Sequence, residues 1–303
     1  MLTAKTTNTV STDRRAEVFA QSDPAGVDNR PGYPGGTISN QAEGEKAEMD
    51  YKCSILITTF QRPHLLKWGL YSLARQHIPF PLETIVINDA VEGDGTEEIC
   101  KEYADRLNIK YIFSGKRNLG ENIKWRVPGF AINIGAKQSS GKVIIISCAE
   151  MFHINDTIAL LTEPVLHNPK SIGIPIGKDD QDGSFLNHLI MNNGHHNVEM
   201  LNKYPKLNAL LPFLMSVSRQ QFDEIGGSDE DFTGIAYDDN DFVDRLLANG
   251  CKYIQTEAKT VHLYHPRYVY GKEQHADLLF NKNLYLSRKG IIVRNKGRDW
   301  GHI

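Results

Sequence analysis

Short apolar runs alternate with stretches of helical spacing along the first half of the chain, and this alternation constrains the fold more than any other feature. After the first run, Pro63 suits a first helical turn, and Leu66 and Leu70 recur at a helical interval. The strands that we expect are 53–58, 84–88, 109–113 and 142–147. Strands that alternate with helices predict an α/β fold, with a mostly parallel, Rossmann-like sheet covered by helices on both faces.

Polar residues follow these predicted strands. In open α/β sheets, ligands lie outside the carboxyl ends of the strands. The first strand is not followed by a GxGxxG fingerprint, and Gly135 and Gly141 are not spaced as in a P-loop, so a nucleotide must be held in another way. The polar residues at the strand ends are Thr59, Arg62, Asp89, Arg117, Asn118 and Glu150.

The first fifty residues differ from the rest of the chain. They are rich in Thr, Asn, Gly, Pro and Ala and contain almost no apolar run of strand length. Such a composition cannot bury enough apolar surface to form a core, so we expect residues 1–50 to be a disordered arm. We expect residues 51–270 to form the main domain. Apolar residues recur at helical spacing after Tyr270, which predicts a C-terminal helical extension over 271–303.

Charge and cysteine usage narrow the class of protein. The first fifty residues account for the net charge of −3, so the remainder is near neutral, which argues against tight non-specific binding to nucleic acid. The four cysteines lie far apart without a CxxC pair, which favours reduced thiols. We find neither a signal-peptide pattern nor a run of about 18 apolar residues. We therefore expect a cytoplasmic protein without a transmembrane segment.

Acidic residues crowd into two short stretches of the second half, 229–231 and 238–241. Neighbouring carboxylates repel one another unless a cation or a proton-donating substrate meets them. Asp241 is explained without function, because it lies in the first turn of a predicted helix, four residues before Arg245. The adjacent pair Asp238-Asp239 is less well explained in this way. This segment therefore predicts an active site.

The same segment resembles the acceptor-side block of inverting family 2 glycosyltransferases of the GT-A fold, and the resemblance extends back to Cys53. It implies a GT-A type sheet and a hexosyltransferase that takes a nucleotide-sugar donor, such as a UDP-sugar. In this family the second acid of the pair is the base, which implies that Asp239 is the base and that Asp238 orients the acceptor. The residues that carry the resemblance are Ser218-Arg219, Phe222, Gly226-Gly227, Asp229-Glu230, Phe232, Asp238-Asp239 and Arg245.

The resemblance also implies donor contacts at the ends of the first two strands. Thr58, Thr59 and Arg62 correspond to the polar turn that follows the first strand in this family. Asp89 corresponds to the aspartate that contacts the nucleotide base. Alternatively, the threonines cap the following helix and Asp89 forms an Asx-turn.

A further donor contact is implied for Asn133, in a segment similar to the family's Ala-Arg-Asn-x-Gly helix. Here Ile132 stands where arginine is usual, which removes a bidentate phosphate contact. Arg117 with Asn118 supplies the charge instead, or forms a plain exposed turn, and both interpretations stay open.

The metal motif departs most from the family. The family has Asp-x-Asp after the fourth strand, whereas this chain has Cys148-Ala149-Glu150, so Glu150 is the remaining carboxylate ligand. One carboxylate with substrate phosphates and water can hold Mg²⁺ or Mn²⁺. His262, in a strand similar to the family's metal-ligand strand, completes the shell or is a structural histidine. In an extended segment His265 points to the opposite face, so only one of the two reaches the metal.

These assignments predict direct displacement with inversion. Glu150 and a divalent cation neutralise the departing diphosphate, while Asp239 takes the proton from the hydroxyl of a glycan, a lipid-linked or another acceptor. One alternative is a nucleotidyltransferase, which needs a glycine-rich loop that the turn after the first strand lacks. Another is an inactive nucleotide- or carbohydrate-binding relic, which the missing first aspartate favours. Residues 177–205 lack periodicity and are expected to form an acceptor-side flap.

Overall fold

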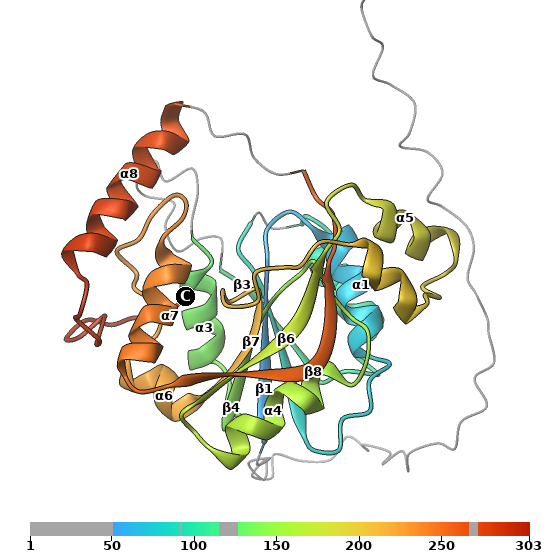
Figure 1. Ribbon diagram of the computed structural model, residues 1–303, viewed down its shortest axis with the longest axis horizontal. Helices are drawn as coiled ribbons and strands as arrows, with labels where there is room; N and C mark the ends of the chain where they lie inside the picture. The colour runs from blue at the N-terminus through green and yellow to red at the C-terminus, as the bar shows by residue number, and fades with distance from the viewer. Residues whose placement is uncertain (1–50, 91–92, 115–126, 267–271) are drawn as a thin grey trace, which may run out of the picture. The chain divides into compact units, whose positions relative to one another are not determined.

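Eight strands of the described residues form one sheet, in the order β3-β2-β1-β4-β7-β6-β8-β5 (Figure 1). The computed structural model describes residues 51–90, 93–114, 127–266 and 272–303. All of them belong to one compact unit, Glu48–Ile303. The predicted arm, residues 1–50, lies outside the described residues. The strands are β1 Cys53–Thr59, β2 Leu82–Asn88, β3 Ile109–Phe113, β4 Val143–Cys148, β5 Met151–His153, β6 Ser171–Asp179, β7 Leu214–Ser218 and β8 Lys252–His262.

The first four strands are parallel, which confirms what their alternation with helices predicted. β1 pairs with β2 on one side and with β4 on the other, and β2 also pairs with β3. Successive side chains of a strand point to opposite faces. Leu56 lies in the apolar core beneath α3 (Gly129–Lys137), and Ile55 lies in a second core beneath α1 (Pro63–Leu73). Helices therefore cover both faces of this half of the sheet, as predicted.

The second half of the sheet is mixed rather than parallel. β7 runs antiparallel to both β4 and β6, and β5 runs antiparallel to β8. β6 and β8 are parallel, with a bulge in their pairing between Ile174 and Ile176. Pro175 lies at this bulge, where its missing backbone N–H leaves no ladder bond unmade. The regular parallel arrangement thus ends at β4.

Residues 177–205 were expected to lack regular structure, and this is wrong for much of their length, because they contain a helix and a 3-10 helix. Their role as an acceptor-side flap stays a prediction. Phe185, Leu189 and Leu201 of these elements are buried in an apolar cluster with Phe152. The helices of the described residues are α1 and α3 as above, α2 Thr96–Tyr103, α4 Thr157–His167, α5 Ser184–Met191, η1 Val198–Lys203, α6 Arg219–Glu224, α7 Asp238–Ala248 and α8 Lys272–Ser287. None of these helices has the length and apolar character needed to cross a membrane.

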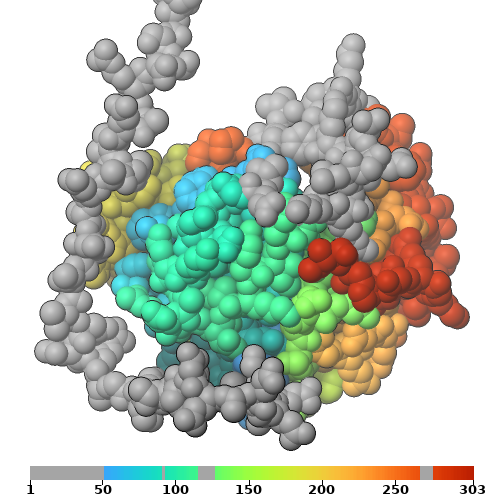
Figure 2. Space-filling model, turned by 180° about the vertical axis from the view of Figure 1, so that it is seen from behind, coloured from blue at the N-terminus to red at the C-terminus, as the bar shows by residue number. Residues whose placement is uncertain are grey.

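The C-terminal part begins with the helix predicted there, α8, and continues after Ser287 without regular structure. This last segment attaches to the turn that follows α6. The Arg294 N–H donates to the Ile225 carbonyl, and the Asn295 amide donates to the Gly226 carbonyl. Figure 2 shows the C-terminal residues, in red, against the orange surface of α6 and α7. The extension is therefore part of the main domain's surface.

Candidate active site

Glu150 lies in a tight turn at the carboxyl end of β4. The register of β1 and β4 places Thr58 beside Cys148. Two backbone hydrogen bonds hold the turn that follows. The Ala149 N–H donates to the Thr58 carbonyl, and the Leu263 N–H donates to the Glu150 carbonyl. The turn thus fixes a carboxylate whose side chain is only 7% exposed.

Cationic and imidazole side chains surround this carboxylate. Arg62 forms an ion pair with Glu150, and the Nε2 atoms of His265 and His262 lie 3.5 and 3.8 Å from Glu150 Oε1. Burial alone would raise the pKa of Glu150, but the hydrogen bond from His262 and the charge of Arg62 lower this pKa to about 2. Glu150 is therefore ionised at neutral pH although it is buried.

The expectation that His262 and His265 point apart is wrong. It assumed that one extended strand includes both residues, but β8 ends at His262. His265 follows in an irregular segment, and both imidazoles lie within 4 Å of Glu150. The alternation of side chains therefore does not separate them.

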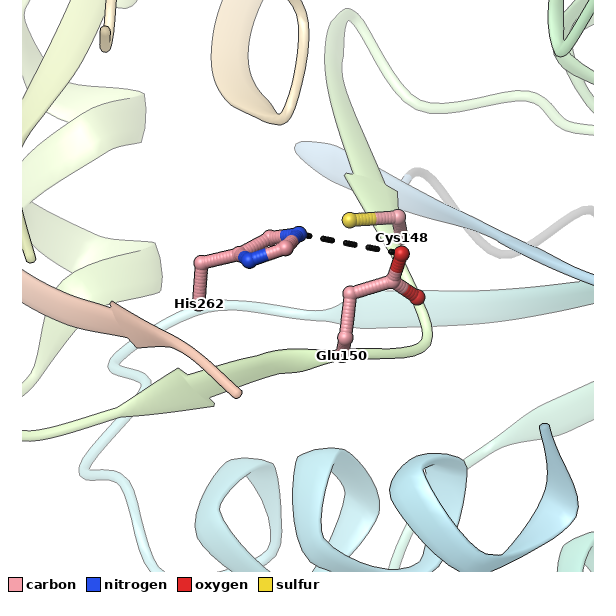
Figure 3. A group of neighbouring side chains, drawn as sticks. All are labelled: Cys148, Glu150 and His262. Atoms are coloured by element: carbon pink, nitrogen blue, oxygen red, sulfur yellow. Dashed lines mark ion pairs between the residues drawn. The ribbon is translucent and has the colours of Figure 1, made fainter. Parts of the chain in front are cut away.

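Three side chains are close enough to hold a metal ion together. The ligand atoms of Cys148, Glu150 and His262 all lie within 4.8 Å of one another. In Figure 3 the Cys148 sulfur points toward the His262 ring, and a dashed line joins the ring to the Glu150 carboxylate. His262 Nδ1 lies 3.3 Å from Asp179 Oδ1, and a carboxylate in this position orients a metal-binding imidazole. Thiol, carboxylate and imidazole are all ligands of divalent transition metals, so the donor set fits the implied cation.

Asp179 is a residue of this group that the sequence reasoning missed. It is the last residue of β6, and the register of β6 and β8 places it opposite His262. Isoleucines that alternate with other residues over 172–176 carried a strand signal. Pro175 within this run obscured the signal, because proline inside a strand is typical of edges and bulges.

Thr58, Thr59 and Arg62 lie at the end of β1, where the sequence placed them. The Thr58 hydroxyl donates to the Ser147 carbonyl at 3.4 Å. The Thr59 hydroxyl is buried and has no hydrogen-bond partner among the described residues. The alternative in which the threonines cap α1 is wrong, because α1 begins after Arg62 without a side-chain cap. Their predicted donor contacts stay predictions.

Asp89 lies at the neighbouring point, just after β2. Its N–H donates to the Thr59 carbonyl, and its carboxylate accepts a hydrogen bond from the Ser114 hydroxyl. It therefore lies next to the end of β1, and its contact with a nucleotide base stays a prediction. Arg117 and Asn118, the other predicted donor contacts, lie outside the described residues.

Asn133 is fully buried in α3 and joins this helix to the turn before the acidic pair. Its amide donates to the Ser228 carbonyl and to Glu230, and its side-chain oxygen accepts from the Ser228 N–H. These bonds give Asn133 a structural role, and its predicted donor contact is not tested by them. Ile132 is 4% exposed and packs in the core.

Asp238 and Asp239 begin α7 after an unusual turn. Ala236 and Tyr237 have φ angles of 72° and 69°, in a region that residues with side chains rarely adopt and that is found at functional sites. Burial raises the pKa of both carboxyls; for Asp238 the charge of Asp239 adds to the rise, and the pKa of Asp239 reaches about 6. A carboxylate with a pKa close to neutral is suited to accept a proton.

Asp241 is held by ion pairs, as its spacing from Arg245 predicted. Arg245 Nε lies 2.7 Å from Asp241 Oδ2, and Arg294 Nη2 lies 2.8 Å from Asp241 Oδ1. All three side chains are at most 5% exposed. Two arginines thus compensate the charge of Asp241, whereas burial raises the pKa of Asp238 and of Asp239.

Asp239 of the acidic pair interacts electrostatically with Cys148, a member of the potential metal group. Burial raises the pKa of the Cys148 thiol well above its ordinary range, and the charges of Glu150 and Asp239 add to the rise. Asp239 therefore lies within electrostatic range of Cys148. The site combines potential metal ligands at the strand ends with a carboxyl group of raised pKa at the start of α7.

The sheet has the topology of the GT-A class of α/β folds. Potential metal ligands lie at its strand ends, beside an acidic pair. The sequence model of glycosyl transferase family 2 matches residues 54–226, so the chain belongs to this family. A second family model, described as the N-terminal domain of galactosyltransferase, matches residues 194–267. This second match includes the acidic pair and His262.

Curated relatives share parts of this sequence. Validoxylamine A glucosyltransferase of Streptomyces hygroscopicus is 34% identical over 91 residues, which cover 30% of this chain and 20% of that protein. Chondroitin synthase of Escherichia coli is 24% identical over 258 residues, which cover 76% of this chain and 37% of that protein. The chain thus spans well under half the length of these relatives.

Solved structures share the fold. Staphylococcus aureus TarS superposes with a TM-score of 0.50 and 18% identity, over 78% of this chain and 39% of TarS. GalNAc-T7, solved with UDP, GalNAc and Mn²⁺, superposes with a TM-score of 0.54 and 13% identity, over 79% of this chain and 52% of that chain. At these identities the likeness concerns the fold alone.

Proposed function

We propose that this chain is an inverting glycosyltransferase, which moves a sugar from a nucleotide-diphosphate sugar to an acceptor hydroxyl by direct displacement. The observation that carries the proposal is a pair of unlike acidic groups, Glu150 and Asp239, whose charges both act on the Cys148 thiol. Glu150 stays ionised among potential metal ligands, whereas Asp239 has a pKa of about 6. Paired acids whose surroundings separate their pKa values take different chemical roles. Membership of family 2 supports the same class of reaction.

The base in this reaction is Asp239. Its carboxylate accepts the proton of the acceptor hydroxyl while the acceptor oxygen bonds to the anomeric carbon, and the bond from that carbon to the diphosphate oxygen breaks. The bond forms on the face opposite the leaving group, so the anomeric configuration inverts. Asp238, adjacent and buried, orients the acceptor.

The donor lies across the ends of β1, β2 and β4. Thr58, Thr59 and Arg62 contact the diphosphate side, and Asp89 contacts the base, with Arg117, Asn118 and Asn133 as further predicted donor contacts. Glu150 and His262 would hold a divalent cation, with Asp179 orienting His262. When bound, such a cation supplies positive charge that stabilises the departing diphosphate.

UDP is the first nucleotide to test. TarS has been solved with UDP, with a TM-score of 0.50 to this chain, and GalNAc-T7 with UDP and Mn²⁺. The acceptor is a hydroxyl of a glycan, a lipid-linked glycan or another molecule. The relatives named above do not determine which sugar this chain transfers, so a panel of UDP-sugars is required.

The stereochemistry of the product tests the proposal directly. A panel of UDP-sugars is incubated with the chain and Mn²⁺, first for donor hydrolysis and then with candidate acceptors, and the anomeric configuration is followed by NMR. We expect UDP release and a product of inverted configuration. A product of retained configuration would contradict direct displacement, and UDP binding without turnover of any donor would indicate a nucleotide-binding relic.

A further inference from the structure

The third member of the potential metal group is Cys148. A thiolate ligand prefers other metals than a carboxylate ligand does. Cys148 is the last residue of β4, and its sulfur lies within 4.8 Å of the ligand atoms of Glu150 and His262. Carboxylate sites suit hard cations such as Mg²⁺, whereas thiolates select softer metals such as Zn²⁺. The sulfur is directed into this group in Figure 3.

We propose that Cys148 is a metal ligand, and that with Glu150 and His262 it makes the site selective for thiophilic divalent cations, Zn²⁺ or Co²⁺, over Mg²⁺. The inference deepens the proposed function, because it concerns the cation of the same site. It does not depend on the sugar transferred.

One measured distance suits a small tetrahedral ion. Two ligands that each lie about 2.1 Å from a tetrahedral metal are about 3.4 Å apart. His262 Nε2 and Glu150 Oε1 are 3.8 Å apart, and the Cys148 sulfur lies within 4.8 Å of both. Arg62 is paired with the same Glu150 oxygen, so a bound cation would replace this pairing. Three protein ligands leave the fourth position for a substrate oxygen, as in catalytic zinc sites.

The surroundings of the three ligands support metal binding. Asp179 Oδ1 lies 3.3 Å from His262 Nδ1, on the side of the ring away from Glu150, and such a carboxylate fixes the imidazole that faces the metal. His262 Nδ1 is buried and makes no hydrogen bond of good geometry among the described residues. Binding would release the thiol proton of Cys148 to solvent, because only the thiolate coordinates.

A simpler alternative is that the Cys148 side chain only packs in the protein interior. Its sulfur lies 3.7 Å from the Phe213 carbonyl, a weak hydrogen bond, and free cysteines are common in protein cores. A packing side chain and a metal ligand differ in one measurable property, since only the ligand forms a metal–sulfur bond.

Cobalt spectroscopy separates these two roles. The full chain, kept reduced, is titrated with Co²⁺ alone and with Zn²⁺ in competition, and the near-ultraviolet thiolate-to-cobalt charge-transfer band is recorded. We expect the band in the parent and in Cys251→Ser, a matched control in which a buried cysteine that donates to Gln221 is replaced. We expect no band in Cys148→Ser.

Metal preference provides the second measurement. Cys148→Asp supplies a hard ligand at the same place, so we expect the ratio of Zn²⁺ to Mg²⁺ affinity to fall at least about tenfold. X-ray absorption of the zinc-loaded parent is expected to show one sulfur at about 2.3 Å, and this measurement needs no variant that must fold.

Each outcome decides the inference. Bound Co²⁺ without a thiolate band, zinc without a sulfur neighbour, or an unchanged affinity ratio in Cys148→Asp would overturn it. None of these measurements uses glycosyl transfer. A thiolate band in a chain that transfers no sugar would therefore contradict the proposed function and leave the ligand assignment standing.

Discussion

Glu150 shows how a buried charge is kept ionised. A carboxyl group taken out of water normally becomes neutral, but Arg62 and two imidazoles compensate this one and its pKa is about 2. The same partners make the site strongly cationic once the carboxylate is removed. Substitution of Glu150 therefore tests electrostatics and metal binding together.

We expect Glu150→Gln to abolish the dependence of UDP binding on a divalent cation, because the amide keeps the shape but is a poor ligand. Calorimetric titration with UDP, with and without Mn²⁺ or Co²⁺, measures this effect. Glu163→Gln, on the exposed side of α4, is the control. An affinity for UDP that still rises with the cation in Glu150→Gln would remove Glu150 from the metal site.

The same residue predicts acid sensitivity. The pKa of Glu150 falls from its ordinary value of 4.5 to about 2 in the folded chain, so the carboxylate contributes stability above pH 4.5 that is lost as the pH falls toward 2. Glu150→Gln is expected to remove this part of the pH dependence. Thermal denaturation between about pH 2 and pH 6 measures it, and parallel curves for parent and variant would contradict the assignment.

Asp239 differs from Glu150 because its pKa is raised, to about 6. A base must be ionised to act, so turnover is expected to rise with pH up to about 6 and then to level.

Asp239→Asn should lower turnover by about 10²- to 10⁴-fold and leave donor affinity nearly unchanged. Asp244→Asn, on the exposed side of the same helix, is the control. If Asp238→Asn is inactive while Asp239→Asn is not, the two roles are reversed.

The stability effect of Asp239 has the opposite sign to that of Glu150. Since its folded pKa of about 6 exceeds the ordinary 3.8, its contribution is fully present below about pH 4 and is lost as the pH rises through 6. The burial that raises the pKa of the proposed base therefore lowers the stability of the folded protein at neutral pH.

At the scale of elements, the sequence predicted what local patterns determine. Strands β1 to β4 are short, mostly apolar runs, and proline starts α1, so their type and order followed from residue spacing. The β6 strand was missed because Pro175 interrupts it, and α5 because its partners, such as Phe152, come from a distant strand. The meeting of Asp179 with His262 depends on strand register, which no local pattern shows.

The turn before α7 depends on α8 in a similar non-local way. The Asn281 amide donates to the carbonyls of Thr233, Ile235 and Ala236, and Asn281 is fully buried. These bonds hold the left-handed backbone that leads to Asp238. The spacing of apolar residues predicted the helix, but the residue that anchors it is polar.

We expect Asn281→Ala to lower turnover by up to about 100-fold, because a small displacement of the proposed catalytic pair, Asp238 and Asp239, is costly. Donor affinity should change little, since the hydrogen bonds of the Asn281 side chain among the described residues go to the turn before α7 and not to Glu150. Steady-state kinetics compared with Asn283→Ala, exposed on the same helix, measures the effect. Equal turnover in the two variants would show that the turn keeps its shape without α8.

At the scale of the whole molecule, the end of the chain supports the acidic site. Arg294 lies 2.8 Å from both Asp229 and Asp241, and Arg288 pairs with Asp229 and Asp231. The C-terminal segment therefore connects the turn after α6 to the first turn of α7. The acidic partners are crowded in the sequence, but the arginines that pair with them lie far along the chain, so only the folded chain brings the two sets together.

Arg294→Met tests this connection, because it leaves two buried carboxylates short of a partner. Removal of one partner from a buried ion pair typically costs about 3–5 kcal/mol, so we expect the melting temperature to fall by on the order of 10 °C. Arg298→Met is the matched control: its side chain is 38% exposed, and the loss there should be about 1 kcal/mol or less. Differential scanning calorimetry at neutral pH measures both. Equal, small losses would mean that the C-terminal segment lies on the surface without supporting α7, and the proposed base, Asp239, would then need another anchor.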